Sequence, residues 1–316
     1  MTNKRPVAVV GAGLVGSGWA LVFARAGYSV QAYDPSPEVR DRILPWARQS
    51  IGELEAVGLV GDQEMVLSRI TVHDTLVKAL AGAFYIQESV YETIPAKTEV
   101  SMAIDSVMDK DAVVGSSSSG IPASKFTESY SNRARFLIAH PVNPPHLVPV
   151  VEIVPAPWTA PEAVEMVSEL MRAIDQVPVR LTREIDGFVL NRLQGVLLNE
   201  AWALYQDGIA SLADIDATIA HGLGLRWSFM GPFETIDLNA PGGVADYVER
   251  FGPLLGGITQ EQTPYDYDTT TVDRVAEARR AALPLDRIEE RSAWRDRRLM
   301  ALVAHKRGQA EIPESG

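Results

Sequence analysis

The 316-residue chain contains no cysteine. Disulfides, thiolate zinc sites and cysteine nucleophiles are therefore excluded, and the sequence predicts no metal site. No apolar run reaches the length that a membrane span needs, and the apolar stretch LVFARAGYSV (21–30) is interrupted by arginine. The N-terminus runs into a strand-like stretch without a basic–apolar–small leader, so we expect a cytoplasmic protein with no membrane partner.

Positive charge is scarce relative to negative charge. The chain has 29 lysines and arginines against 41 aspartates and glutamates, which gives a formal net charge of −12. This surplus argues against nucleic acid as a partner, because phosphate backbones bind basic surfaces. A small anionic ligand is still compatible, because local positive sites can lie within an acidic surface. The length favours two domains, or one large domain with an appendage.

The first 34 residues have the order strand, glycine turn, helix, strand, acid. The β-branched run RPVAVV (5–10) leads directly into GAGLVG (11–16), and apolar residues then follow at helical spacing up to Gly27. A second strand, YSVQAYD, ends on Asp34. Gly11 permits a tight turn, Gly13 lets a pyrophosphate approach the backbone, and Gly16 lets helix and strand pack closely. This context predicts dinucleotide binding at the start of the helix.

Asp34 indicates which dinucleotide is bound. A carboxylate at this point accepts hydrogen bonds from ribose hydroxyls and repels a 2′-phosphate. No arginine follows Asp34 directly. The sequence therefore favours NAD over NADP.

Strands and helices continue to alternate as far as residue 154. A charged helical stretch begins near Ser36 and carries Pro45, where we expect a kink. Further strands are predicted in five runs, in the order RITVH, FYIQESV, AVVGSSSSG (112–120), FLIAH and VPVVEIV. The third run ends in four serines. The pattern is typical of an α/β fold, a Rossmann-type doubly wound and mostly parallel sheet.

The second part of the chain reads as an all-helical domain. FVLNRLQGVLLNEAWALYQDGIA (188–210) predicts a helix of about six turns. Its apolar residues cover so much of the circumference that we expect one side to face a second subunit, which makes the protein a homodimer. Ser211 stands at an N-cap position three residues before Asp214. We divide the chain into a dinucleotide-binding domain, 1–185, and a helical substrate and dimerisation domain, 186–316.

His140 is the strongest candidate for chemistry among the five histidines. An enzyme that oxidises an alcohol with a nicotinamide cofactor needs a base for the hydroxyl proton, and imidazole has a suitable pKa. His140 ends a strand, and the prolines after it predict a rigid, extended path over 141–149. A partly buried strand terminus without chemistry is the alternative. His73 and His305 are expected on the surface, and His146 lies within the proline-rich loop.

Glu152 stands mid-strand in the apolar run that follows. A carboxylate that points inward there needs a partner, and His140 would satisfy it and fix the imidazole tautomer. Alternatively, Glu152 points outward to solvent. Strand pairing cannot be read from one sequence, so the spacing of twelve residues does not decide between the two.

Five segments together resemble the 3-hydroxyacyl-CoA dehydrogenase family: GAGLVG…YD, SSSSG, AHPVNPP, PVVEIV and DGFVLNRL. They cover nearly the whole chain, in the family's order. The details HPVNPP, GLRWSFMGPFETIDLN and WRDRRLM resemble its lambda-crystallin branch, the L-gulonate 3-dehydrogenases. Ser117 and Ser118 stand where the acyl-CoA enzymes carry Asn and Thr, which fits this branch and weakens the case for a CoA thioester.

The resemblance implies a role for each matched residue. His140 matches the catalytic base and Glu152 its orienting carboxylate, while Ser119 and Asn191 match groups that contact the substrate. The cofactor contacts implied are Gly11, Gly13, Leu14, Val15, Gly16, Asp34, Glu92, Lys97, Ser119 and Asn143.

Arg226, in GLGLRWSFMGP, is a further substrate candidate. A guanidinium among apolar residues suits bidentate binding of a free carboxylate, although a structural ion pair or a helix C-cap would also explain it. Three functions stay open. The first is an NAD-dependent dehydrogenase of a free 3-hydroxy acid such as L-gulonate or 3-hydroxybutyrate. The second is a 3-hydroxyacyl-CoA or L-carnitine dehydrogenase, and the third is a non-catalytic, NAD(H)-binding structural protein of the crystallin kind. The intact set of Ser119, His140, Glu152 and Asn191 argues against the third.

Overall fold

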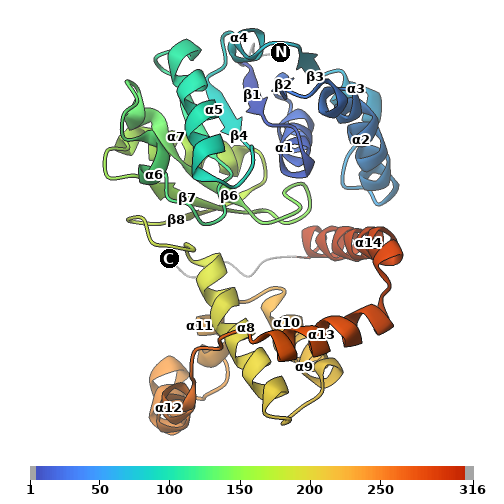
Figure 1. The fold of residues 1–316 in the computed structure, drawn as a ribbon, viewed down its shortest axis with the longest axis vertical. Helices are drawn as coiled ribbons and strands as arrows, with labels where there is room; N and C mark the ends of the chain where they lie inside the picture. The colour runs from blue at the N-terminus through green and yellow to red at the C-terminus, as the bar shows by residue number, and fades with distance from the viewer. Residues whose placement is uncertain (1–4, 310–316) are drawn as a thin grey trace. The chain divides into compact units, whose positions relative to one another are not determined.

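The computed structural model describes residues 5–309, which form two compact units. The first unit comprises residues 5–191 together with 294–309, and the second comprises 192–293. Our division of the chain at 185/186 assigned everything after the boundary to the helical domain. The compact units instead group 294–309 with the N-terminal part of the chain. Each unit is described by itself below (Figure 1).

The first unit is built on an eight-stranded sheet with the order β3-β2-β1-β4-β5-β6-β7-β8. Neighbouring strands from β3 to β6 pair in parallel, β7 is antiparallel to β6, and β8 is parallel to β7. This arrangement confirms the doubly wound, mostly parallel sheet. The strands are β1 (Val7–Val10), β2 (Val30–Tyr33), β3 (Ile70–His73), β4 (Tyr85–Glu88), β5 (Val113–Ser116), β6 (Phe136–Pro141), β7 (Val150–Pro155) and β8 (Val177–Arg180).

Helices cover both faces of this sheet, so every residue of the inner strands β1, β4 and β5 is buried. In β1, Val7 and Val9 contribute to one core cluster and Ala8 and Val10 to the other, as the two-residue repeat of a strand requires. The helical segments before residue 180 are α1 (Leu14–Arg25), α2 (Pro37–Ala56), α3 (Gln63–Leu67), α4 (Leu76–Leu80), α5 (Ile94–Val107), α6 (Ser124–Thr127), η1 (Arg133–Arg135) and α7 (Pro161–Ala173).

Local signals fix the ends of the helices around the glycine turn. Gly27 has φ +90° just beyond α1, the left-handed conformation in which glycine ends helices. Ser36 caps α2, because its hydroxyl accepts the Val39 N–H at 3.2 Å. Pro45 lies inside α2, which continues through it to Ala56.

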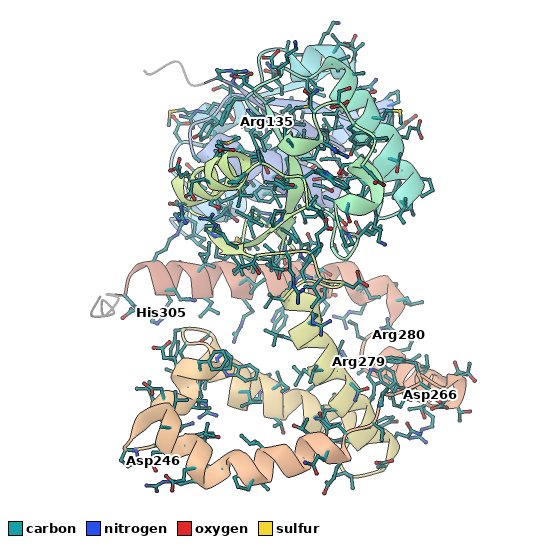
Figure 2. The ribbon with its side chains drawn as sticks, turned by 90° about the vertical axis from the view of Figure 1, so that its left-hand side faces the viewer. Arg135, Asp246, Asp266, Arg279, Arg280 and His305 are labelled. Atoms are coloured by element: carbon teal, nitrogen blue, oxygen red, sulfur yellow. The ribbon has the colours of Figure 1, made fainter. Side chains whose placement is uncertain are left out.

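The second unit contains helices and no strand among its described residues. The helical segments from residue 190 onward are α8 (Leu190–Gln206), α9 (Leu212–Thr218), η2 (Ile219–Leu223), α10 (Gly224–Trp227), α11 (Pro232–Asp237), α12 (Gly243–Glu261), α13 (Thr269–Ala282), η3 (Leu285–Arg287) and α14 (Ile288–Arg307). Arg279 of α13 forms an ion pair with Asp216 of α9 at 3.7 Å (Figure 2 labels Arg279). Ser211 caps α9 by accepting the Asp214 N–H, as predicted.

The helix predicted over 188–210 is shorter in the structure. α8 has 17 residues and begins only at Leu190, because Phe188 has φ +51° and cannot continue a right-handed helix. It ends before Gly208, which has φ +69°. Within residues 5–309, no helix combines the length and the apolar composition that crossing a membrane requires.

Candidate active site

The glycine turn lies between β1 and α1, and the space around its three glycines differs. Gly11 has φ +85°, and a Cβ there would lie 2.6 Å from the Ser89 carbonyl oxygen. A Cβ on Gly16 would lie 1.8 Å from the Gly11 oxygen, so only glycine allows the turn to close on the helix. No heavy atom lies within 4 Å of a Cβ on Gly13. That side of the turn is open to a pyrophosphate, so the residues fit a bound dinucleotide.

The Asp34 carboxylate is held next to this turn. One oxygen accepts the Ala12 N–H and the other accepts the Ser36 N–H, both at 2.9 Å. These bonds fix the carboxylate at the ends of β1 and β2. Its remaining lone pairs are available for ribose hydroxyls.

Three residues of α2 that the sequence did not single out also line this site. A hollow of about 230 Å³ is bounded by the glycine turn and by Val39, Arg42 and Trp46. Arg42 contributes a positive charge beside the helix N-terminus where a pyrophosphate is expected. No sequence motif marks Arg42 or Trp46, because their place depends on how α2 packs against α1.

His140 and Glu152 form a buried pair. β6 and β7 are antiparallel with His140 directly opposite Glu152, and the Nδ1 of His140 lies 2.8 Å from the Oε2 of Glu152. Only 4% of His140 and 1% of Glu152 is exposed. The register therefore answers the question that spacing left open: the carboxylate points inward onto the imidazole. This contact assigns the Nδ1 proton to the Glu152 side, so Nε2 can accept a proton.

The second oxygen of Glu152 binds the start of α8. Oε1 accepts the N–H groups of Val189 and Leu190 at 2.8 and 2.9 Å. Burial alone raises the pKa of the Glu152 carboxyl. The hydrogen bonds from His140 and from the two backbone N–H groups outweigh burial and hold that pKa below its usual value. Glu152 is thus an ionised group at a helix N-terminus, where a negative charge is favourable.

The loop between β6 and β7 differs in part from the prediction. The segment 141–149 contains no helix, as expected, but it is not extended throughout. Leu147 and Val148 both donate their N–H groups to the Pro144 carbonyl, at 3.0 Å each, so the chain turns here. The turn is what brings β7 back alongside β6 and places Glu152 opposite His140.

The four consecutive serines at the end of β5, Ser116 to Ser119, have four different environments. Ser116 donates to Glu88, and the Ser117 hydroxyl lies 2.8 Å from both the Gln87 amide nitrogen and the Ser89 hydroxyl. The Ser118 hydroxyl lies 2.7 Å from Glu92 Oε1. Within residues 5–309 the Ser119 hydroxyl has no hydrogen-bond partner, and Ser119 is exposed. It is the hydroxyl of this run that is free for a ligand.

Glu92 and Lys97, expected as cofactor contacts, hold the serine turn in this structure. Glu92 Oε1 accepts the N–H groups of Ser119 and Gly120 at 2.8 and 3.1 Å in addition to the Ser118 hydroxyl. Lys97 is fully buried, and its ammonium lies 3.3 Å from Glu88 and 3.4 Å from Glu92. Burial opposes ionisation of Glu92, but the Ser118 hydroxyl, the Lys97 charge and the two N–H groups hold its pKa below the usual range.

Asn191 joins the serine turn to the histidine pair. Its side-chain amide donates to the Ser119 carbonyl oxygen at 2.6 Å, and it directly follows Leu190, whose N–H binds Glu152. The structure therefore brings together His140, Glu152, Ser119 and Asn191. It is an arrangement of a base, an orienting carboxylate, a hydroxyl and an amide at the edge of a dinucleotide-binding sheet.

Comparison with known proteins identifies the family of the chain. Residues 6–185 match the NAD binding domain of 3-hydroxyacyl-CoA dehydrogenase, and residues 187–282 match the C-terminal domain of the same enzymes.

The chain belongs to the 3-hydroxyacyl-CoA dehydrogenase family. Members of this family are NAD-dependent dehydrogenases that act on 3-hydroxy groups, so NAD is the cofactor of the first unit.

Among relatives, the chain is 40% identical to the lambda-crystallin homolog of Bos taurus over 306 residues, which is 95% of each chain. It is 34% identical to the L-carnitine dehydrogenase of Streptomyces griseus over 314 residues, or 99% of this chain and 92% of the relative. A solved structure of 5-formyl-3-hydroxy-2-methylpyridine 4-carboxylic acid 5-dehydrogenase, an NAD⁺-dependent dismutase, has a TM-score of 0.84 and 27% identity and covers 97% of this chain and 99% of its own.

Two of the predicted site residues have no side-chain partner within residues 5–309: Asn143, expected from the family resemblance, and Arg226, expected from its own chemistry. Asn143 is exposed in the loop after β6, and its contact with the nicotinamide stays a prediction. Arg226 is exposed on α10 and forms no ion pair with the described residues, so the structural ion pair considered from the sequence is not seen. No three His, Asp or Glu side chains in the described chain come together as metal ligands would.

Proposed function

We propose that this protein oxidises the 3-hydroxyl of a free hydroxy acid to the 3-keto acid, with NAD⁺ as the acceptor and His140 as the general base. The observation that carries the proposal is the buried contact of 2.8 Å between His140 Nδ1 and Glu152 Oε2. A carboxylate on Nδ1 fixes the tautomer that leaves Nε2 unprotonated. Membership of the family makes the protein an NAD-dependent oxidoreductase. The roles of the individual residues are proposed from their contacts.

In this mechanism Nε2 of His140 takes the proton of the substrate hydroxyl. The imidazolium that forms is stabilised by Glu152, whose charge is already held by two backbone N–H groups. Ser119 and Asn191 fix the reacting oxygen by donating hydrogen bonds to it. The glycine turn and Asp34 would hold NAD⁺, which would supply the acceptor for the hydride that leaves the substrate carbon. Glu92 keeps Ser119 in place through the backbone of the serine turn.

Two features support a free carboxylate as the substrate handle. Arg226 is an exposed guanidinium without a protein partner among the described residues, which suits bidentate binding of a carboxylate. The enzyme whose solved structure has the TM-score of 0.84 is named for a substrate that is a carboxylic acid. L-gulonate and 3-hydroxybutyrate are the substrates we place first.

L-carnitine is the second candidate, favoured by exposed aromatic side chains beside Arg226. Trp227, Phe229 and Phe233 are 40%, 67% and 77% exposed, although large aromatic residues are usually buried. Aromatic faces of this kind bind a trimethylammonium group. The Streptomyces griseus relative carries the name of this activity.

A substrate panel tests the proposal. NADH production is followed with L-gulonate, 3-hydroxybutyrate, L-carnitine and 3-hydroxybutyryl-CoA, using the wild type, His140→Ala and Arg226→Gln. We expect turnover on a free acid, loss of kcat by about 10²- to 10⁴-fold in His140→Ala with NADH binding retained, and a raised KM in Arg226→Gln. Activity on the thioester alone would overturn the free-acid assignment. If His140→Ala turned over at the wild-type rate, His140 would not be the general base. A wild type that binds NADH but turns over none of these substrates would favour the crystallin-like alternative.

We also propose that the protein is a homodimer through its helical unit. Apolar side chains that would normally be buried are exposed there, among them Leu193 and Val196 of α8 at 63% and 62% and Leu254 of α12 at 62%. Analytical ultracentrifugation tests this state. A single species of twice the 34.4 kDa chain mass is expected, and a monomer at all concentrations would contradict the proposal.

A further inference from the structure

A cavity of about 410 Å³ lies in the first unit at the end of α1 opposite to the glycine turn. Arg25, Ala26 and Gly27 line it, and they lie at the C-terminus of α1, whereas Gly13 lies at the N-terminus. α1 has 12 residues, so the two ends are about 18 Å apart. The cavity is therefore separate from the dinucleotide site.

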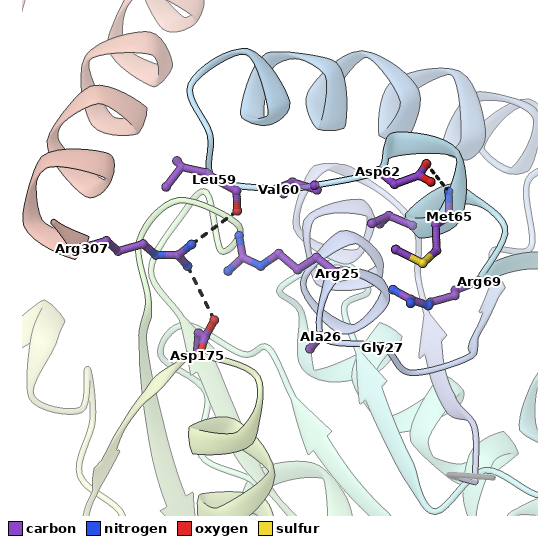
Figure 3. A pocket seen from close by; sticks show the side chains of 12 residues that line it. Arg25, Ala26, Gly27, Leu59, Val60, Asp62, Met65, Arg69, Asp175 and Arg307 are labelled. Atoms are coloured by element: carbon purple, nitrogen blue, oxygen red, sulfur yellow. Dashed lines mark hydrogen bonds and ion pairs between the residues drawn. The ribbon is translucent and has the colours of Figure 1, made fainter. Parts of the chain in front are cut away.

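Three arginines from distant parts of the sequence meet in this cavity (Figure 3). Arg25 ends α1, Arg69 directly precedes β3, and Arg307 is the last residue of α14. The charged side chains that oppose them on the cavity wall are Asp62 and Asp175. Asp62 is already used as the N-cap of α3, where it accepts the Met65 N–H at 3.0 Å.

The positive charges are incompletely neutralised. Arg25 and Arg69 form no ion pair with the residues that the structure describes, and each donates only to a backbone carbonyl, that of His146 at 2.7 Å and that of Ala24 at 2.9 Å. Arg307 reaches Asp175 only at 3.7 Å. Burial and then the nearby Arg307 charge lower the pKa of Arg25 to about 10, while Asp175 acts in the opposite direction.

The α1 terminus does not supply the missing negative charge. The carbonyls of Val22, Phe23 and Ala24 already accept backbone N–H groups from the residues that follow the helix. The guanidinium groups therefore retain N–H donors that face the cavity, in a chain whose overall charge is −12. Arg25 is half-buried and Arg307 is exposed. A half-buried guanidinium without a counter-ion is unfavourable, and an anion entering from solvent would relieve this.

We propose that this cavity binds a phosphate dianion between Arg25 and Arg307, either as free phosphate or as the phosphate of a small ester. Guanidinium forks match the geometry of phosphate oxygens. Arg25 is held by its bond to the His146 carbonyl, and Arg307 donates to the Leu59 carbonyl at 3.4 Å. Asp175 limits the affinity, since it shares Arg307 with the anion.

Isothermal titration calorimetry on the full chain tests the site. Sodium phosphate is titrated at about pH 8, where phosphate is mainly a dianion, with saturating NADH to block the glycine turn and with chloride at matched ionic strength as the blank. We expect one saturable site per chain. Glycerol 3-phosphate is titrated in parallel, and saturable binding of either ion with the variant pattern below supports the proposal.

Two variants should act in opposite directions. Arg307→Gln should weaken phosphate affinity by about tenfold, because it removes a charged donor. Asp175→Asn should strengthen it by about threefold, because it removes a competing charge. Asp175 has φ +60°, a conformation that asparagine also adopts, so this variant should fold normally.

Lys306→Gln is the matched control, because it removes one positive charge next to Arg307 but does not line the cavity. Its affinity should equal that of the wild type within about twofold. Absence of saturable binding, or equal affinity of Arg307→Gln and the wild type, would overturn the proposal. Because the readout is binding, these outcomes are independent of which substrate the enzyme oxidises.

Discussion

The substitution Glu152→Gln isolates the contact on which the proposed chemistry depends. It preserves the size of the side chain while it removes the charge. Glu152 accepts two backbone N–H groups on Oε1 and faces His140 on Oε2. If the glutamine oxygen keeps the backbone bonds, its NH₂ group points at His140 Nδ1. Nδ1 must then act as an acceptor, and the imidazole proton moves to Nε2, where it blocks the base.

The size of the effect follows from this tautomer change. Loss of a general base costs about 10²- to 10⁴-fold in kcat, which is about 3–5 kcal/mol in the activation barrier. The free energy of unfolding should fall by only about 1–2 kcal/mol, because one charge-assisted contact at the start of α8 is replaced by a neutral one. Activity should therefore fall far more than stability.

The assay compares kcat and KM for NADH production with the melting temperature of each variant. Glu165→Gln is the control, because Glu165 is an exposed carboxylate that pairs with Arg180 on the surface. It should leave kcat unchanged. The tautomer argument is refuted if Glu152→Gln keeps more than about a third of the wild-type kcat while its KM for NAD⁺ and its melting temperature are unchanged.

Three further predictions follow from the same contacts. Gly16→Ala should lower the free energy of unfolding by about 1–3 kcal/mol, because its Cβ would overlap the Gly11 oxygen. Gly13→Ala has room for its Cβ and should weaken only NADH binding. Melting curves measure the first effect and NADH fluorescence measures the second. The folded pKa of Glu152 lies below its ordinary 4.5, so its stabilisation is complete above about pH 4.5 and is lost as the pH falls through the folded value. The difference in melting temperature between the wild type and Glu152→Gln should thus close below pH 4.5, and a constant difference there would contradict this. Asp34→Ser should raise the NADP-to-NAD ratio of kcat/KM by about a hundredfold, because it removes the charge that repels a 2′-phosphate. An unchanged ratio would mean that residues other than Asp34 set the cofactor selectivity.

Much of the fold could be predicted because its signals are local. The glycine turn, α1 and β2 lie within the first 34 residues, and each is specified by neighbouring residues: apolar period, glycine positions and a terminal acid. The same holds for the caps at Ser36 and Ser211. The start of α8 could not be predicted as reliably, because it depends on the left-handed conformation of Phe188, and phenylalanine gives no local signal for that conformation.

The candidate site was only partly accessible from sequence. The residues of the site could be named from residue type and from the resemblance. That Glu92 holds the serine turn could not be predicted, because it contacts residues 26 to 28 positions further along the chain. Arg42 and Trp46 were missed because they approach the glycine turn through the packing of α2 on α1.

The sequence by itself determined that a dinucleotide-binding unit precedes a helical one, that Asp34 favours NAD, and that His140 is the histidine with a suitable setting for catalysis. Only the tertiary structure decided that Glu152 faces this histidine, because a strand register is set by pairing across the sheet and not by spacing along the chain. It also decided that residues 294–309 join the first unit and that Arg25 and Arg307 meet in one cavity. Residues almost the full length of the chain apart become neighbours only when burial of the apolar surface closes the fold.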